Sequence, residues 1–198
     1  MKFFAGLFLL LFLATSVNAG QNLESNSAVA VTNGRTFVCV SADMVDQRIR
    51  FGLIGSSSAA TNSTTGETSD RFDLSGSAEL HLHFDGHEFA TDFRPKLDSS
   101  MARLDYRVDE VSYRREVVVN GTNQTITVRI RADHQRRLHF TARLENPETN
   151  AQSHIIGTNI LSLANQTAEI KTDGTVLVEP NSLKVKGANT ATVTITAR

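Results

Sequence analysis

The sequence lacks the features that mark several protein classes. It has one cysteine, Cys39, and no tryptophan among its 198 residues. A disulfide within the chain is therefore excluded. The thiol, flanked by Val38 and Val40, is expected to be buried, with a cross-link to a second chain as the alternative. No Gly-x-Ser-x-Gly elbow and no phosphate-binding glycine loop is present, so no specific catalytic signature marks the chain.

Long apolar runs are absent beyond the first 19 residues, so we expect no membrane span in the mature protein. The run from Phe3 to Ala14 follows Lys2, and Val17 and Ala19 occupy the positions that a signal peptidase reads. Residues 1–19 are therefore predicted to be a signal peptide, and the mature protein to be secreted or periplasmic. Residues 20–198 are expected to form one β domain with a flexible Ser/Thr-rich loop at 55–70.

Hydrophobic residues recur at every second position along most of the chain, and a helical period is almost absent. Such alternation predicts strands with one buried and one solvent-facing side, as in antiparallel sheets. We therefore expect an all-β fold, an antiparallel β-sandwich of about ten strands, with a soluble β-barrel as the alternative. The clearest segments are RIRFGLI (48–54), AELHLHF (78–84), ARLDYRVDEV (102–111), TITVRIRA (125–132), RRLHFTARLE (136–145) and ATVTITAR (191–198).

Turn signals separate these segments. Asn120 and Gly121 in VVVNGTNQTITV predict one hairpin, and Asp173 and Gly174 in IKTDGTVLV predict another.

Histidines and carboxylates crowd the stretch SAELHLHFDGHEF, residues 77–89. If this is a strand, His81 and His83 share its polar face, about 7 Å apart, and two imidazoles at that spacing can lean onto one divalent metal ion. Glu88 and His139 are the candidates for further ligands. The alternative is that these residues are only the polar face of a half-buried strand, and no cofactor is then expected.

The spacing of His81, His83 and Glu88 resembles the first motif of the cupin family, and AELHLHF resembles the zinc-binding strand of the alpha-class carbonic anhydrases. Both resemblances imply a metal centre on this strand. Each covers only a short part of the chain, and Pro95 stands where the cupin motif has a glycine.

Charge is unevenly spread along the chain. Residues 20–93 hold 4 Arg/Lys against 10 Asp/Glu, whereas residues 94–143 hold 11 against 6. Guanidinium groups on one sheet face would suit an anionic partner, such as an envelope or cell-surface component, an acidic glycan or an acidic protein surface. Pairing with Asp105, Asp109, Glu116 and Asp133 is the alternative. Nucleic acid is not expected, since aromatic residues do not interleave with the basic ones. The predicted anion-binding arginines are Arg103, Arg107, Arg129, Arg131, Arg137 and Arg143.

Four sequons, at Asn62, Asn120, Asn123 and Asn165, would be glycosylation sites in a eukaryotic secreted protein. Together these features favour a non-enzymatic exported β-sandwich that acts by surface contact, as a structural, adhesive or envelope-associated binding protein. The alternatives are an exported metal-binding protein or metalloenzyme that uses the His-x-His strand, and a β-barrel that binds a small ligand.

Overall fold

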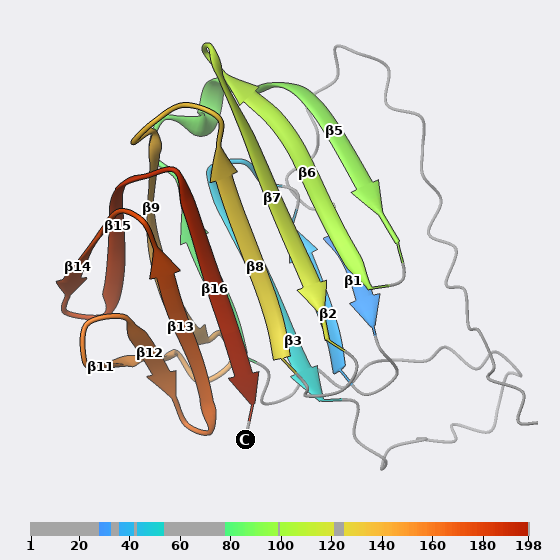
Figure 1. Cartoon of the computed structure of the whole chain (residues 1–198). Helices are drawn as coiled ribbons and strands as arrows, with labels where there is room; N and C mark the ends of the chain where they lie inside the picture. Colours follow the sequence, from blue (N-terminus) through green and yellow to red (C-terminus); the bar gives the residue numbers. More distant parts are fainter. Residues whose placement is uncertain are drawn as a thin grey trace, which may run out of the picture.

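Two antiparallel sheets packed face to face make up the part of the protein that the structure describes (Figure 1). The computed structural model describes residues 28–32, 36–41, 43–53, 78–98, 100–120 and 125–197. The predicted signal peptide, the predicted loop at 55–70 and the sequons at Asn62 and Asn123 lie outside these residues. The predicted antiparallel sandwich is confirmed, although the described residues form sixteen strands rather than about ten. Each sheet is open, so the alternative of a closed barrel is wrong.

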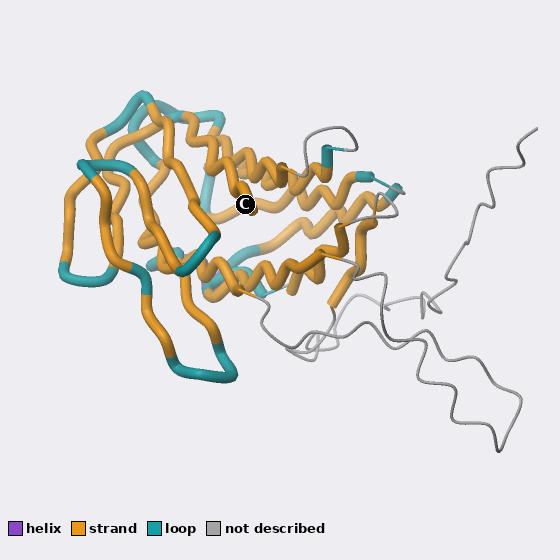
Figure 2. Tube along the Cα trace, turned by 90° about the horizontal axis from the view of Figure 1, so that it is seen from below, coloured by secondary structure: helices purple, strands orange, loops and turns teal. Residues whose placement is uncertain are grey.

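The first sheet, sheet A, contains the first four strands of the described chain and four later ones. Figure 2 shows the two sheets as separate layers, viewed from below. In spatial order, sheet A runs β1 (Ala28–Thr32), β2 (Thr36–Ser41), β3 (Asp46–Leu53), β4 (Ala78–His83), β9 (Leu138–Asn146), β15 (Ser182–Ala188) and β14 (Thr175–Glu179), with β10 (Ala151–Gln152) attached to β9.

The second sheet, sheet B, is built around a meander from β5 to β8. A short helical turn, η1 (His87–Phe89), carries the chain to it from β4. In spatial order, sheet B runs β11 (His154–Ile156), β12 (Ile160–Leu163), β13 (Gln166–Thr172), β16 (Thr190–Ala197), β8 (Thr125–Ala132), β7 (Val111–Val119), β6 (Met101–Val108) and β5 (Thr91–Leu97). Within the described residues, no helix is long and apolar enough to cross a membrane.

The core lies between the sheets and follows the alternation read from the sequence. On β4, the side chains of Ala78, Leu80 and Leu82 are buried, and Phe84 just after the strand joins them. The inward positions of the other predicted strands are buried in the same way, because period-two alternation places every second side chain on the inner face. They include Ile49, Phe51, Tyr106, Val108, Ile126, Val128, Ile130, Leu138, Phe140, Ala142, Leu144, Val193 and Ile195.

Of the two predicted hairpins, one is confirmed and one is wrong. β7 and β8 pair as expected on either side of residues 120–124. By contrast, β13 belongs to sheet B and β14 to sheet A, so the chain crosses between the layers at Asp173 and Gly174. The Asp173 carboxylate fixes this crossing by accepting the backbone N–H groups of Asn189 and Thr190, both at 2.9 Å. A Cβ on Gly174 would lie 2.7 Å from the Lys186 carbonyl oxygen, so the glycine permits a close approach.

The single cysteine is not part of the core. Val38 and Val40 point inward, which places Cys39 between them on the outer face of β2, half-buried and opposite Arg50. Partial burial nevertheless raises the pKa of the thiol, so the thiolate form is disfavoured.

Candidate functional site

The main candidate site is an open groove on the outer face of sheet B, over β5 to β8, with a volume of about 590 Å³. Three aspartates, Asp92, Asp105 and Asp133, contribute to its lining. Five arginines do so as well: Arg94, Arg103, Arg107, Arg114 and Arg131. The groove is therefore cationic overall but carries carboxylates within it.

The strand register gathers these charges into two rows that run across the sheet. Residues directly opposite one another on paired strands share a face of the sheet. The first row consists of Arg94, Asp105, Arg114 and Arg131, and the second of Lys96, Arg103, Glu116 and Arg129. Each row thus holds three cations and one carboxylate, contributed by four different strands.

Within the first row, Asp105 neutralises part of the positive charge. Its carboxylate accepts hydrogen bonds from Nε of Arg103 at 2.8 Å and from Nε of Arg114 at 2.7 Å. Burial opposes ionisation of Asp105, but these two hydrogen bonds outweigh it and lower the pKa of the carboxyl group. Arg94 and Arg131 differ, since no carboxylate of the described chain forms an ion pair with either. Their guanidinium groups are exposed and available to a ligand.

A β-bulge shapes the β5 side of the groove. The pairing of β5 with β6 shifts between Thr91 and Arg94, so that Asp92 and Phe93 together oppose Tyr106. Asp92 has a φ of 56°, in the left-handed region that few residues other than glycine adopt. Both Asp92 and Arg94 line the groove as a result.

The six predicted anion-binding arginines are divided between different surfaces. Arg103, Arg107 and Arg131 line the groove, and Arg129 lies in the neighbouring row on the same face. Arg137 lies in the turn before β9, where its carbonyl accepts the Tyr113 hydroxyl, and Arg143 lies on β9 in sheet A. The sequence prediction did not include Arg94 and Arg114, because it could not establish which strands are neighbours.

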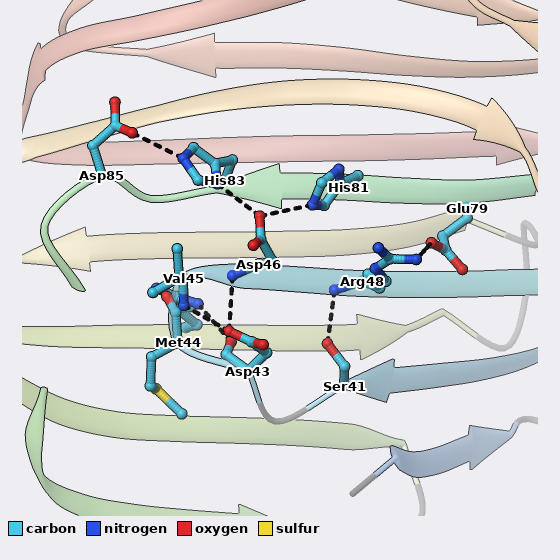
Figure 3. Close-up of polar contacts among 11 residues, drawn as sticks. Ser41, Asp43, Met44, Val45, Asp46, Arg48, Glu79, His81, His83 and Asp85 are labelled. Atoms are coloured by element: carbon cyan, nitrogen blue, oxygen red, sulfur yellow. Dashed lines mark hydrogen bonds and ion pairs between the residues drawn. The ribbon is translucent and has the colours of Figure 1, made fainter. Parts of the chain in front are cut away.

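The predicted histidine pair lies on the outer face of the other sheet (Figure 3). His81 and His83 point toward Asp46 at the start of β3, and its Oδ1 lies 3.0 Å from His81 Nε2 and 2.6 Å from His83 Nδ1. The second ring nitrogen of His83, Nε2, lies 2.8 Å from Asp85 Oδ1. Further along the same face, buried Glu79 is paired with Arg48 and Arg50.

This geometry favours the doubly protonated form of His83. An ionised carboxylate can only accept hydrogen bonds, so each ring nitrogen must carry a hydrogen to bind its aspartate. The hydrogen bond to Asp46 is the main cause that raises the pKa of His83, with a further contribution from Asp85.

Removal of one of the two aspartates should reverse this effect. We expect Asp85→Asn to bring the pKa of His83 closer to the ordinary histidine value of about 6.5, since one charge-assisted hydrogen bond is lost. A titration of the imidazole signals by NMR measures the change. An unaltered His83 titration in the variant would show that the contact with Asp85 is absent in solution.

The four predicted metal ligands are not gathered at one point. Glu88 is exposed on η1, and Nδ1 of His139 accepts the Gly187 N–H at 3.3 Å. Among the residues that the structure describes, no three His, Cys, Asp or Glu side chains are arranged to hold a metal ion. Metal binding by His81 and His83 stays a prediction.

A buried cationic cluster, not predicted from the sequence, lies between the sheets. Arg115 on β7 points inward and is 1% exposed. Its Nη2 donates to the Met44 carbonyl at 2.6 Å and its Nη1 to the Asp43 carbonyl at 3.4 Å. The guanidinium carbon also lies 3.6 Å from the centre of the Phe84 ring. Arg115 thereby ties sheet B to the loop that precedes β3.

His87 completes this cluster as a neutral imidazole. Its Nδ1 lies 3.2 Å from Arg115 Nη2 and 2.9 Å from the Tyr106 hydroxyl. Since a guanidinium can only donate, Nδ1 must be the acceptor and the proton must sit on Nε2. Burial, followed by the charge of Arg115, lowers the pKa of His87 to about 4.

Two of the four sequons fall in the described chain. Asn120 is exposed at the end of β7, and Asn165 is exposed in the turn between β12 and β13. The position of Asn120 next to a hairpin turn agrees with the sequence prediction, whereas the turn at Asn165 was not predicted from the sequence.

A family comparison adds what the geometry alone does not give. Residues 43–198 match the family described as "Glycosyl hydrolase family 65, N-terminal domain". The chain belongs to this family. The matched residues of this chain include the loop held by Arg115 and every strand of the groove. No curated protein matches the chain.

Proposed function

We propose that the chain is an exported, non-catalytic β-sandwich module that works by surface contact in the context of a glycoside hydrolase, and that it binds an acidic partner in the groove on sheet B. Membership of the glycosyl hydrolase family 65 N-terminal domains supports the enzymatic context. Export remains part of this proposal and rests on the signal-peptide pattern of residues 1–19.

The observation that carries the binding role is the pair of exposed guanidinium groups on Arg94 and Arg131. They lie at opposite ends of one cross-strand row, on β5 and β8. Three steps between strands separate them, roughly 14 Å at the usual spacing. A rigid sheet that presents two unpaired cations at a fixed separation can bind an extended acidic ligand with little rearrangement.

Charge reversal at these two positions tests the proposal. We expect Arg94→Glu combined with Arg131→Glu to lower retention on an acidic polysaccharide resin by tenfold or more, since each exchange replaces attraction with repulsion. Elution by salt and binding to the soluble polymer measure the effect.

Arg143→Glu combined with Lys186→Glu is the matched control. Both residues are exposed on the outer face of sheet A, and the net charge changes by the same amount. Equal losses in the two double variants would mean that only net charge matters, and the groove would then have no binding role.

A further inference from the structure

We infer that the groove selects a sparsely charged acidic saccharide, in which uronic acid carboxylates alternate with neutral hydroxyl-bearing sugars, over a densely charged polyanion. This inference rests on the proposed function, because it assumes that the groove binds an acidic partner. It adds the chemical class of that partner.

The carboxylates in the groove are the first argument. Asp92, Asp105 and Asp133 lie among the five arginines, so phosphate or sulfate groups packed closely along a chain would meet repulsion as well as attraction. The hydrogen bond from His134 is the main cause that lowers the pKa of Asp133 to about 2. This carboxylate therefore stays charged near neutral pH.

The same carboxylates suit sugar hydroxyl groups. An ionised aspartate is an acceptor that binds O–H donors strongly, whereas a guanidinium binds a uronate carboxylate through two parallel hydrogen bonds. Arg94 follows Asp92 by two residues and Asp133 follows Arg131 by two, and all four line the groove, so each end of it offers both kinds of group. The volume of about 590 Å³ is in the range of sites for small organic ligands.

The bulge at Asp92 is the second argument. A non-glycine residue at a φ of 56° costs conformational energy, and bulges of this kind often re-aim a side chain at a binding site. Here the bulge brings an acidic side chain into a cationic groove. In this position the Asp92 carboxylate can accept hydrogen bonds from hydroxyl groups of the ligand.

Calorimetry with three probes tests the inference on the full chain. The probes are aldotriouronic acid (one glucuronate and two xylose units), neutral xylotriose, and inorganic tripolyphosphate. We expect aldotriouronic acid to bind most tightly, with xylotriose at least about tenfold weaker, because a bidentate contact between arginine and carboxylate is lost.

The Asp92→Asn variant is the decisive comparison. Asparagine tolerates the left-handed backbone, so the bulge is retained while the negative charge is removed. We expect the preference for aldotriouronic acid over tripolyphosphate to fall about tenfold, as one charge-assisted hydrogen bond is lost and one repulsion is relieved. Arg131→Gln should weaken the binding of both anions.

Each other result has a defined meaning. If tripolyphosphate binds the unmodified chain as tightly as aldotriouronic acid, or if Asp92→Asn leaves the preference unchanged, the saccharide inference is overturned and the proposed function stands. If neither anion binds, both are overturned.

Discussion

Replacing Arg115 by alanine is expected to lower the free energy of unfolding by about 3–5 kcal/mol, the largest effect of any single substitution considered. The change empties a fully buried site beside Phe84 and Tyr106. It also removes the donors to the carbonyl groups of Asp43 and Met44. Denaturant unfolding monitored by circular dichroism gives the value.

Arg115→Met separates the loss of packing from the loss of charge. Methionine fills much of the same volume and avoids the cost of burying a cation, so we expect it to be destabilising by less than half as much as alanine. The Nε of Arg115 has no hydrogen-bond partner in the described chain, which adds to the cost of the native arginine. If Arg115→Met were as destabilising as Arg115→Ala, the hydrogen bonds of the guanidinium would be the main source of stability.

Acid is expected to destabilise the protein through His87. The folded state holds the pKa of His87 at about 4, below the unfolded value of about 6.5. The unfolded chain therefore takes up a proton first as the pH falls, and stability that is fully present above 6.5 is lost between 6.5 and 4. After allowance for solvent screening, we expect a loss of about 2 kcal/mol between pH 7.5 and 4.5.

His87→Phe should remove this part of the acid sensitivity. The ring of His87 lies among those of Phe84, Tyr106 and Tyr113, so a phenyl ring meets similar surroundings. The measured quantity is the difference in unfolding free energy between pH 7.5 and 4.5, compared with the same difference in the unmodified chain. The control is His154→Asn, because His154 is exposed on the edge strand β11. This variant should retain the full loss of unfolding free energy at pH 4.5. An unchanged loss in His87→Phe would assign the acid sensitivity to other groups.

His83 acts in the opposite direction. Its pKa is raised in the folded state, so the stability that it contributes is present below about 6.5 and is lost as the pH rises through the higher folded value. The two histidines lie only four positions apart in the sequence. They differ because His83 lies at the surface between two carboxylates, whereas His87 is buried beside a guanidinium.

The alternation of hydrophobic and polar residues was sufficient to predict the sandwich. Successive side chains of a strand point to opposite faces, so the sequence alone shows which residues face the core. Leu80, Val128 and Phe140 are buried as this rule requires. The same rule could also have identified Arg115 as a buried residue. It lies two positions from both Tyr113 and Val117 on β7, so its side chain faces inward as theirs do.

Strand neighbours could not be predicted in the same way. The Asp173–Gly174 turn looks like that of a hairpin, but contacts with Asn189 and Thr190 direct the chain to the other sheet. Likewise, the partner of His81 and His83 is Asp46, 35 and 37 positions earlier, rather than the nearby Glu88. Such pairings depend on tertiary contacts, and the sequence around each residue does not contain them.

Arg114 and Arg115 are consecutive, yet one faces the groove and the other reaches across the interior to the loop before β3. The main chain between them is consequently fixed by side-chain contacts on both faces of sheet B, by Arg114 with Asp105 outside and by Arg115 with the Met44 carbonyl inside. The acidic ligand that we propose for the groove would thus meet a guanidinium whose main-chain position is fixed by contacts with the opposite layer. Substitutions deep in the molecule would then alter affinity at the surface while every residue that touches the ligand stays the same.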